Sequence, residues 1–401
     1  MKEFLFSRRN QLIVYILIIF IAPFIMCKYY LQPTIAKISE LSFHLDGFEI
    51  KTIPAISGVL LLIILCLIIK RINLFQILSM LFILLIIAIG QYVSDFYMGN
   101  PFYDIQSNWH YVAYTIFSYL MYRYLSYSKI VPAKIILYTY ITAMLISTAD
   151  EFFQLSMTNR VFDPGDIAKD ILGAVIGLIL IFFVIENGKM IQNGWNFRQK
   201  KFSGYFKNPS SLLLLELILT IIFLCFSSVL TEKNVRINAV FISVAVFGIV
   251  SLLFHFFKYK VVKFILLFLV ICQLVSFGIF CRKNIIYNSQ SLTIYKGIPI
   301  PYFDVMFFEN GFFRLVDKKT FFQLPDLVRI KSYTNDILLL GSGETGKGGG
   351  GLAKKEEMQF IVNEVKQKPL QVLILKNKEA FLMFNKLKEQ NKRVVFILHH
   401  E

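Results

Sequence analysis

The chain has 401 residues, of which 56% are hydrophobic and 17% are charged, and its formal net charge is +16. An average soluble domain has about 45–50% apolar residues and about 25% charged residues. The apolar residues occur in long uncharged blocks, such as 53–69 and 74–89. A helix needs about 20 mostly apolar residues to cross ~30 Å of hydrocarbon, and these blocks lack the alternation of barrel strands. We therefore predict an all-α polytopic membrane helix bundle with a C-terminal soluble α/β domain.

The positive charge does not indicate a nucleic-acid partner, because most Lys and Arg residues flank the apolar blocks, as is typical of membrane orientation. The cysteines form no CxxC pair, and we interpret them as small buried apolar residues rather than disulfide or metal ligands. No cofactor and no metal are expected. The five cysteines are Cys27, Cys66, Cys225, Cys272 and Cys281.

The apolar blocks predict about nine membrane spans. The first follows Arg8 and Arg9 and is interpreted as a retained signal anchor. Basic residues after the second, fourth and sixth spans favour a cytoplasmic N-terminus, and the loop 94–109, without Lys or Arg, is predicted to face outward. The side of the membrane that holds the C-terminal domain is left open. The predicted spans are 11–27, 53–69, 73–92, 110–126, 130–149, 167–186, 211–230, 238–257 and 264–281.

The composition changes after the ninth span, which predicts three regions: 1–192 and 193–283 in the membrane, and 284–401 as the soluble domain. The soluble domain is predicted to begin with strands at 292–295, 303–308 and 312–316. Continuously apolar strands then alternate with helices, as expected for a parallel sheet that is covered on both faces. This βαβαβ unit is predicted as strand 336–340, helix 354–366, strand 371–375, helix 378–390 and strand 393–398.

Polar residues gather in the fourth to sixth spans, where ionisable groups cost ~2.5 kcal/mol or more each and indicate function by default. Asp150 or Glu151 lies three or four residues from Gln154, hence on one helical face. His110 and Tyr114 are one helical turn apart at the start of the fourth span. The predicted topology brings all these side chains to the outer interface.

A stripe on the sixth span combines two carboxylates with two glycines. Asp166, Asp170, Gly173 and Gly177 recur at helical spacing, and the glycines allow another helix to approach closely. Arg160 precedes this stripe in a loop that ends with Pro164-Gly165. A helix N-terminus favours the acid at position 166.

The order HxxxY, DExxQ, R and DxxxDxxGxxxG resembles the VanZ-like family of bacterial membrane proteins, whose name comes from a member linked to teicoplanin resistance. The resemblance covers about residues 1–190, with its motifs in 110–177, and Asp170 stands where many relatives have Asn. It implies a multi-pass protein of the bacterial cytoplasmic membrane with a role in the cell envelope. Carried over by motif are His110, Tyr114, Asp150, Glu151, Gln154, Arg160, Asp166, Asp170, Gly173 and Gly177.

Several functions remain open at this point. The polar cluster can recognise an amphiphile or a lipid-linked headgroup through Arg160, Gln154, Tyr114, Asp166 and Asp170. Alternatively, the protein is an enzyme in which Asp150, Glu151 or His110 acts as acid or base. A third hypothesis is an assembly scaffold that docks a protein partner through residues 284–401. Arg160 can also simply pair with an acid and brace the helices.

A glycine-rich loop follows the strand 336–340 and contains Gly341, Gly343 and Gly346. It imitates a phosphate-binding P-loop, but Gly348 replaces the hydroxyl residue that would ligate Mg²⁺ after Lys347. Nucleotide binding is therefore not expected. A glycine-requiring turn and a shallow anion-binding or docking surface remain the alternatives.

Residues 300–401 resemble a small α/β domain of uncharacterised prokaryotic proteins that is related to a mitochondrial complex I assembly factor. The residues that carry this resemblance are Gly341, Gly343, the Glu379-Ala380 pair, Asn385 and the last strand up to His399. The resemblance implies a small α/β domain without an assigned reaction.

Overall fold

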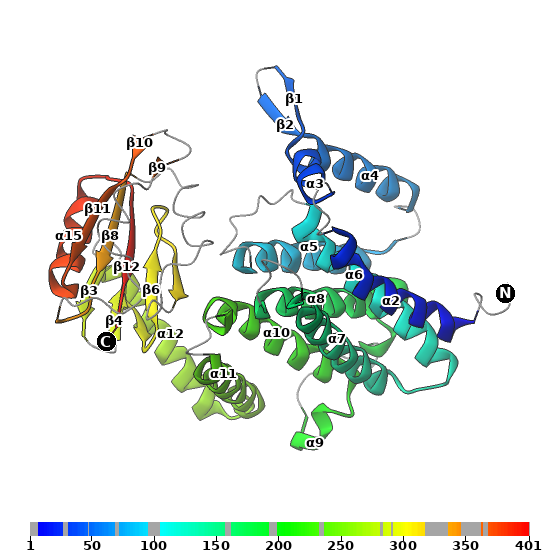
Figure 1. Ribbon diagram of the computed structural model, residues 1–401. Coiled ribbons are helices and arrows are strands. Elements are labelled where there is room, and N and C mark those ends of the chain that lie inside the picture. The colour runs from blue at the N-terminus through cyan, green and yellow to red at the C-terminus, as the bar shows by residue number, and fades with distance from the viewer. Residues whose placement is uncertain are drawn as a thin grey trace. The chain divides into compact units, whose positions relative to one another are not determined.

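A computed structural model of the chain describes most of its helices and strands (Figure 1). Arg160, Gly346 and residues 354–361 and 364–366 of the predicted helix lie outside the described residues. The described ranges are 7–26, 31–46, 48–68, 72–94, 105–156, 162–191, 199–231, 236–280, 284–289, 292–316, 336–345, 362–363 and 368–400.

A helix occupies each of the predicted apolar blocks. Seven helices in the described part of the chain are long and apolar enough to cross a membrane, as expected for a multi-pass membrane protein. The other two predicted spans coincide with α4, which has 17 described residues, and with α6, which is more polar. The helices are α2 (Arg8–Met26), α4 (Thr52–Ile68), α5 (Leu74–Ser94), α6 (Ile105–Tyr127), α7 (Pro132–Gln154), α8 (Pro164–Ile179), α10 (Pro209–Thr231), α11 (Arg236–Phe256) and α12 (Lys260–Phe280).

The structure divides into two units, and the first holds α2 to α8 and most of α10. Its central element is α8, which packs along α6 and α7 and also contacts α5 (Figure 1). Of the seven candidate membrane spans, the one formed by α8 and its continuation to Ile185 has the largest share of buried residues, 78%. Its Ala and Gly residues allow other helices to approach closely on several sides. A π-helical turn, η1 (Leu180–Ile185), continues α8. The residues at the N-terminal end of α8 therefore lie among several helices.

The segment between the first two predicted spans contains structure that the sequence analysis did not predict. Helix α3 (Leu31–Glu40) leads into a hairpin of β1 (Ser42–Leu45) and β2 (Phe48–Lys51). The hairpin is short and its β1 side chains are all exposed, so it contributes little to the core. Three elements of only four to ten residues give no long periodic signal, which explains why the pattern did not reveal them.

The interpretation of the cysteines as buried residues is wrong for Cys66, Cys225 and Cys272, because these side chains are exposed on their helices. Cys27 and Cys281 lie outside the described residues.

The second unit includes α12 and all residues after it. Strands β3 (Ile285–Asn288), β4 (Leu292–Tyr295) and β5 (Ile298–Pro301) form an antiparallel sheet. A second sheet has the order β11-β8-β12-β6-β7. Its strands are β6 (Asp304–Phe307), β7 (Phe313–Val316), β8 (Ile337–Gly341), β11 (Gln371–Leu375) and β12 (Val394–Leu398).

Strand β8 pairs in parallel with β11 and β12, while β6 pairs antiparallel with β12 and with β7. All residues of β8 and β12 are buried, as the continuously apolar sequence predicted. Helix α15 (Asn377–Glu389) packs on one face through Ala380, Phe384 and Leu387 (Figure 1). The predicted strands and the last helix lie within a residue or two of their observed bounds.

Two predictions for this domain differ from the structure. Strands β3 and β5 were not predicted, because β3 has only four residues, and because Gly297 and the prolines of β5 interrupt the apolar pattern there. The predicted helix 354–366 is wrong at its end, where Val362–Asn363 forms strand β9 and pairs with β10 (Lys368–Pro369). Pro369 cannot donate a ladder hydrogen bond, which is consistent with a pairing of only two residues.

Candidate functional site

Close contact between α6 and α8 creates the candidate site in the first unit. A Cβ atom added to Gly173 would lie 3.0 Å from the carbonyl oxygen of His110, and one added to Gly177 would lie 2.9 Å from that of Thr115. The hydroxyls of Thr115 and Ser118 donate to the carbonyl oxygens of Gly173 and Ala174 at 3.1 and 2.9 Å. The two glycines therefore do what the sequence predicted, and they bring His110 beside the first turns of α8.

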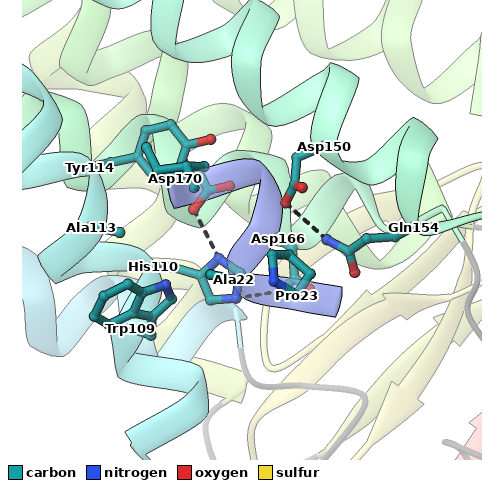
Figure 2. Close-up of a pocket in the computed structure, with 11 residues that line it drawn as sticks. Ala22, Pro23, Trp109, His110, Ala113, Tyr114, Asp150, Gln154, Asp166 and Asp170 are labelled. Atoms are coloured by element: carbon teal, nitrogen blue, oxygen red, sulfur yellow. Dashed lines mark hydrogen bonds and ion pairs between the residues drawn. The ribbon is translucent and has the colours of Figure 1, made fainter. Parts of the chain in front are cut away.

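His110 lies between two carboxylates of α8 (Figure 2). Its Nδ1 is 2.8 Å from Asp170 Oδ1, and its Nε2 is 3.8 Å from Asp166 Oδ1. The other oxygen of Asp170 accepts a hydrogen bond of 2.7 Å from the Ser147 hydroxyl of α7. Asp170 thus connects α6, α7 and α8, and a hydrogen bond to Nδ1 fixes the orientation of the imidazole.

The acids of α7 are organised by Gln154, as their spacing predicted. The Gln154 amide nitrogen donates to Asp150 Oδ2 at 3.0 Å and to Glu151 Oε1 at 3.1 Å. Glu151 Oε2 accepts a hydrogen bond of 2.8 Å from the backbone N–H of Asp163. Because both oxygens of Glu151 have partners, this residue braces the start of α8, whereas Asp150 keeps one oxygen available.

A cavity of about 80 Å³ lies among α2, α6, α7 and α8 (Figure 2). One wall is apolar and comes mainly from α2, and the other carries the acids and His110. A cavity needs ~10–15 Å³ to hold one water, so this one has room for a small polar group. The lining residues are Ile19, Ala22, Pro23, Trp109, His110, Ala113, Tyr114, Asp150, Gln154, Asp166 and Asp170.

Two polar atoms of the cavity wall have no hydrogen-bond partner among the described residues. These are Asp150 Oδ1 and the Tyr114 hydroxyl, whose residues are only 7% and 2% exposed. Tyr114 lies near Ser147 and Asp170 but does not reach hydrogen-bond geometry with either. A buried polar group without a partner costs ~1–3 kcal/mol, so both atoms favour the binding of a polar group at this position.

Carboxylates dominate the charge of the cavity wall. Asp150, Asp166 and Asp170 line it, and the basic side chains near them in the described part of the chain include His110 and Lys169, whose Nζ lies 3.7 Å from Asp166 Oδ1. No group of three or more His, Cys, Asp or Glu residues in the described part of the chain is arranged to hold a metal ion. The wall therefore favours a ligand group that donates hydrogen bonds or carries positive charge.

The structure brings together most of the residues that the sequence singled out. His110, Tyr114, Asp150, Gln154, Asp166 and Asp170 line one cavity, while Glu151 lies beside it and Arg160 is outside the described residues. Sequence reasoning missed Ser147, although it lies three residues before Asp150 on the same helical face. It also missed the wall from α2, which no local pattern reveals because α2 meets α6 and α7 only through the tertiary fold.

The described part of the glycine-rich loop forms a turn that α15 holds. The Gly343 N–H donates to the Asn377 side chain at 3.0 Å, and Asn377 donates to the His399 carbonyl oxygen at 2.6 Å. Gly343 has φ +79°, which favours glycine, and a Cβ on Gly341 would lie 2.7 Å from Asn377 Oδ1. Both glycines thus have structural reasons to be there. Asn385, another residue of the resemblance, holds β3 through two hydrogen bonds to Ile285.

Two histidines follow β12 and are buried at the carboxyl end of the parallel strands. His399 Nδ1 lies 2.8 Å from Asp304 Oδ2, and the His400 ring contacts the Phe303 carbonyl oxygen and the Thr293 hydroxyl, each at 2.7 Å. Burial lowers the pKa of His400 below its ordinary value. These contacts connect β4, β6 and β12, which is a structural role.

Comparisons of the chain with protein-family models, with curated proteins and with solved structures give no match. Both family resemblances therefore depend on the motifs of the sequence alone.

Proposed function

We propose that the chain is a nine-span envelope protein of the VanZ-like type in the bacterial cytoplasmic membrane, with its N-terminus in the cytoplasm. Support comes from the apolar helices, from the basic residues in alternate loops and from the spaced motif residues. In this arrangement α4 and α6 cross the membrane in addition to the seven long apolar helices. The cavity then lies at the outer interface, where a lipid headgroup can reach it.

The function of the cavity is to bind the polar head of an amphiphile. The observation that carries this proposal is the pair of unpartnered atoms, Asp150 Oδ1 and the Tyr114 hydroxyl, in a wall that faces apolar residues of α2. A headgroup that donates hydrogen bonds provides a partner for Asp150 Oδ1. The same headgroup can donate a hydrogen bond to the Tyr114 hydroxyl or accept one from it. An apolar chain beside Ile19 and Ala22 then stays in contact with apolar surface.

The charges of the wall select the class of headgroup. Three carboxylates line the cavity, so a primary ammonium group gains charge-assisted hydrogen bonds and an anionic group is repelled. A guanidinium group binds phosphate or carboxylate through paired hydrogen bonds, so Arg160, which the sequence places between the acids of α7 and α8, suits the acidic part of a zwitterionic molecule. The proposed ligand class is an amphiphile with an ammonium head.

The proposal is tested with Tyr114→Phe and Asp150→Asn in protein that is reconstituted and examined by native mass spectrometry. The probes are phosphatidylethanolamine, which carries an ammonium group, and phosphatidylglycerol, which does not. Wild type should retain the first lipid preferentially. Loss of one charge-assisted hydrogen bond costs ~1.5–3 kcal/mol, so Asp150→Asn should weaken retention by about tenfold or more.

The chain provides matched controls for both variants. Tyr140→Phe removes a hydroxyl that is bonded to Thr220 at 3.1 Å, and should lower stability by ~1 kcal/mol without changing lipid retention. Glu186→Gln neutralises a carboxyl that bonds Tyr122, away from the cavity. Equal retention by wild type, Tyr114→Phe and Asp150→Asn would refute the proposed site.

A second candidate function is an enzyme that acts on such an amphiphile. The observation that favours it is His110, which Asp170 orients and which faces the cavity with Nε2 directed toward Asp166. An imidazole held in this way is a general acid or base. Turnover of a bound lipid by wild type but not by His110→Gln, with unchanged lipid retention, would establish the enzyme; retention without turnover would favour the binding protein.

A further inference from the structure

A further buried acid of the first unit, Glu216, lies apart from the cavity lined by Asp150, Asp166 and Asp170. Glu216 is the only Asp, Glu, Lys or Arg residue between Pro209 and Ser227, a segment apolar enough to cross the membrane. Its side chain is 5% exposed and lies on the buried face of α10 with Leu213, Leu217 and Thr220. An ionisable residue in this position marks an ion or proton site by default.

Neither carboxyl oxygen of Glu216 has a hydrogen-bond partner among the described residues. No salt bridge to it is present in that part of the chain either. An ionised carboxylate that is buried without a partner is destabilised by several kcal/mol, and a neutral carboxyl by much less. The surroundings therefore favour the protonated form.

Two neighbouring hydroxyl groups, those of Thr220 and Tyr140, do not provide hydrogen bonds to the carboxyl. Thr220 donates its hydroxyl proton to the backbone carbonyl oxygen of Glu216 at 2.7 Å. Tyr140 of α7 lies 3.1 Å from the Thr220 oxygen, and because the proton of Thr220 is already engaged, Tyr140 is the donor in this contact. Both protons are used elsewhere, so an anionic Glu216 has no donor from this pair.

We propose that Glu216 is a proton-binding site in the membrane part of the protein. Its ligand is a proton, held on the carboxyl at neutral pH and exchanged when water or a polar partner reaches the acid. This inference does not depend on the proposed headgroup site, since α10 contributes no residue to the lining of the cavity.

The first experiment uses carbodiimides, which react with protonated carboxyls. Reconstituted full-length protein is treated at pH 7 with apolar dicyclohexylcarbodiimide, or with a water-soluble carbodiimide and an amine, and peptides are analysed by mass spectrometry. The exposed control is Glu49, which bonds Lys51 at 2.7 Å; this bond lowers its pKa. Of these two acids, the apolar reagent should modify only Glu216, which is buried and protonated, and the water-soluble reagent should modify only Glu49, because that side chain is exposed to solvent.

The second experiment does not require a reagent to enter the protein. Infrared spectra should show the C=O stretch of a neutral carboxylic acid that is lost in Glu216→Gln and retained in Glu49→Gln. Identical spectra of wild type and Glu216→Gln, or modification of Glu216 by the water-soluble reagent as fast as of Glu49, would overturn the proposal. If Glu216→Gln fails to fold, the labelling of wild type alone decides between the outcomes.

Discussion

The glycine contacts between α6 and α8 predict whether alanine substitutions at these glycines raise or lower the stability of the protein. A Cβ at residue 173 would meet backbone atoms of His110 and Tyr111 at 3.0 Å, and one at residue 177 would meet Thr115 backbone atoms at 2.9–3.0 Å. Ordinary contacts of a Cβ lie at 3.4–4 Å. The backbone of α6 must therefore move, because no flexible side chain can yield.

The expected magnitude follows from two opposing effects. Overpacking costs ~1–3 kcal/mol, whereas replacing a helical glycine by alanine stabilises a helix by ~0.5–1 kcal/mol. Gly173→Ala and Gly177→Ala should therefore lower stability by up to about 2 kcal/mol each. Movement of α6 also lengthens the contact of 2.8 Å between His110 and Asp170, so retention of the headgroup ligand should fall with it.

Gly248 of α11 is the matched control, because a Cβ there has no atom of the described residues within 4 Å. Gly248→Ala should leave stability unchanged or raise it by ~0.5–1 kcal/mol. The assay is thermal unfolding of purified protein in detergent, together with native mass spectrometry of bound lipid. If Gly173→Ala and Gly177→Ala unfold at the temperature of Gly248→Ala, the close packing described here is wrong.

Three further predictions follow from the topology and the contacts. In a cysteine-free background, Ser107→Cys should react with an impermeant thiol reagent in intact cells and Ser203→Cys should not; the opposite labelling would place the cavity on the cytoplasmic side. Glu151→Gln should lower stability by ~1 kcal/mol, because it weakens the hydrogen bonds of Glu151 with Gln154 and Asp163. Arg160→Ala should keep normal protein abundance and lose lipid retention; a loss of stability equal to that of Glu151→Gln would instead mean that Arg160 only braces the helices. Because burial lowers the pKa of His400, its unfolded form binds protons more readily, so hydrogen-exchange protection of β12 should fall as pH drops below ~6.5, and unchanged protection at pH 5 would contradict this.

The sequence predicted those parts of the structure that a local period encodes. Helical spacing placed Asp150 and Gln154 on one face, and the interval between Gly173 and Gly177 predicted a close helix contact. The apolar runs placed β8, β11 and β12 within a residue of their bounds. In each case the residues that carry the sequence pattern are the same few residues that form the structural feature.

Features that depend on contacts between distant segments could not be predicted in this way. The apolar wall from Ala22 and Pro23 requires α2 to lie beside α6 and α7, which no pattern within α2 indicates. The engagement of both Glu151 oxygens depends on the backbone of Asp163. Glu216 was overlooked because the apolar block around it predicts a span, and only the tertiary contacts show that the acid has no hydrogen-bond partner among the described residues.

An experimental structure of the protein in a lipid bilayer tests the central claim most directly, because it shows what occupies the space between Asp150 and Tyr114. We expect density of a headgroup that contacts Asp150 Oδ1 and the Tyr114 hydroxyl, with an acyl chain beside Ile19. A closed cavity in which Asp150 and Tyr114 satisfy each other, or one that contains only water, would contradict the assignment of this cavity as a headgroup site.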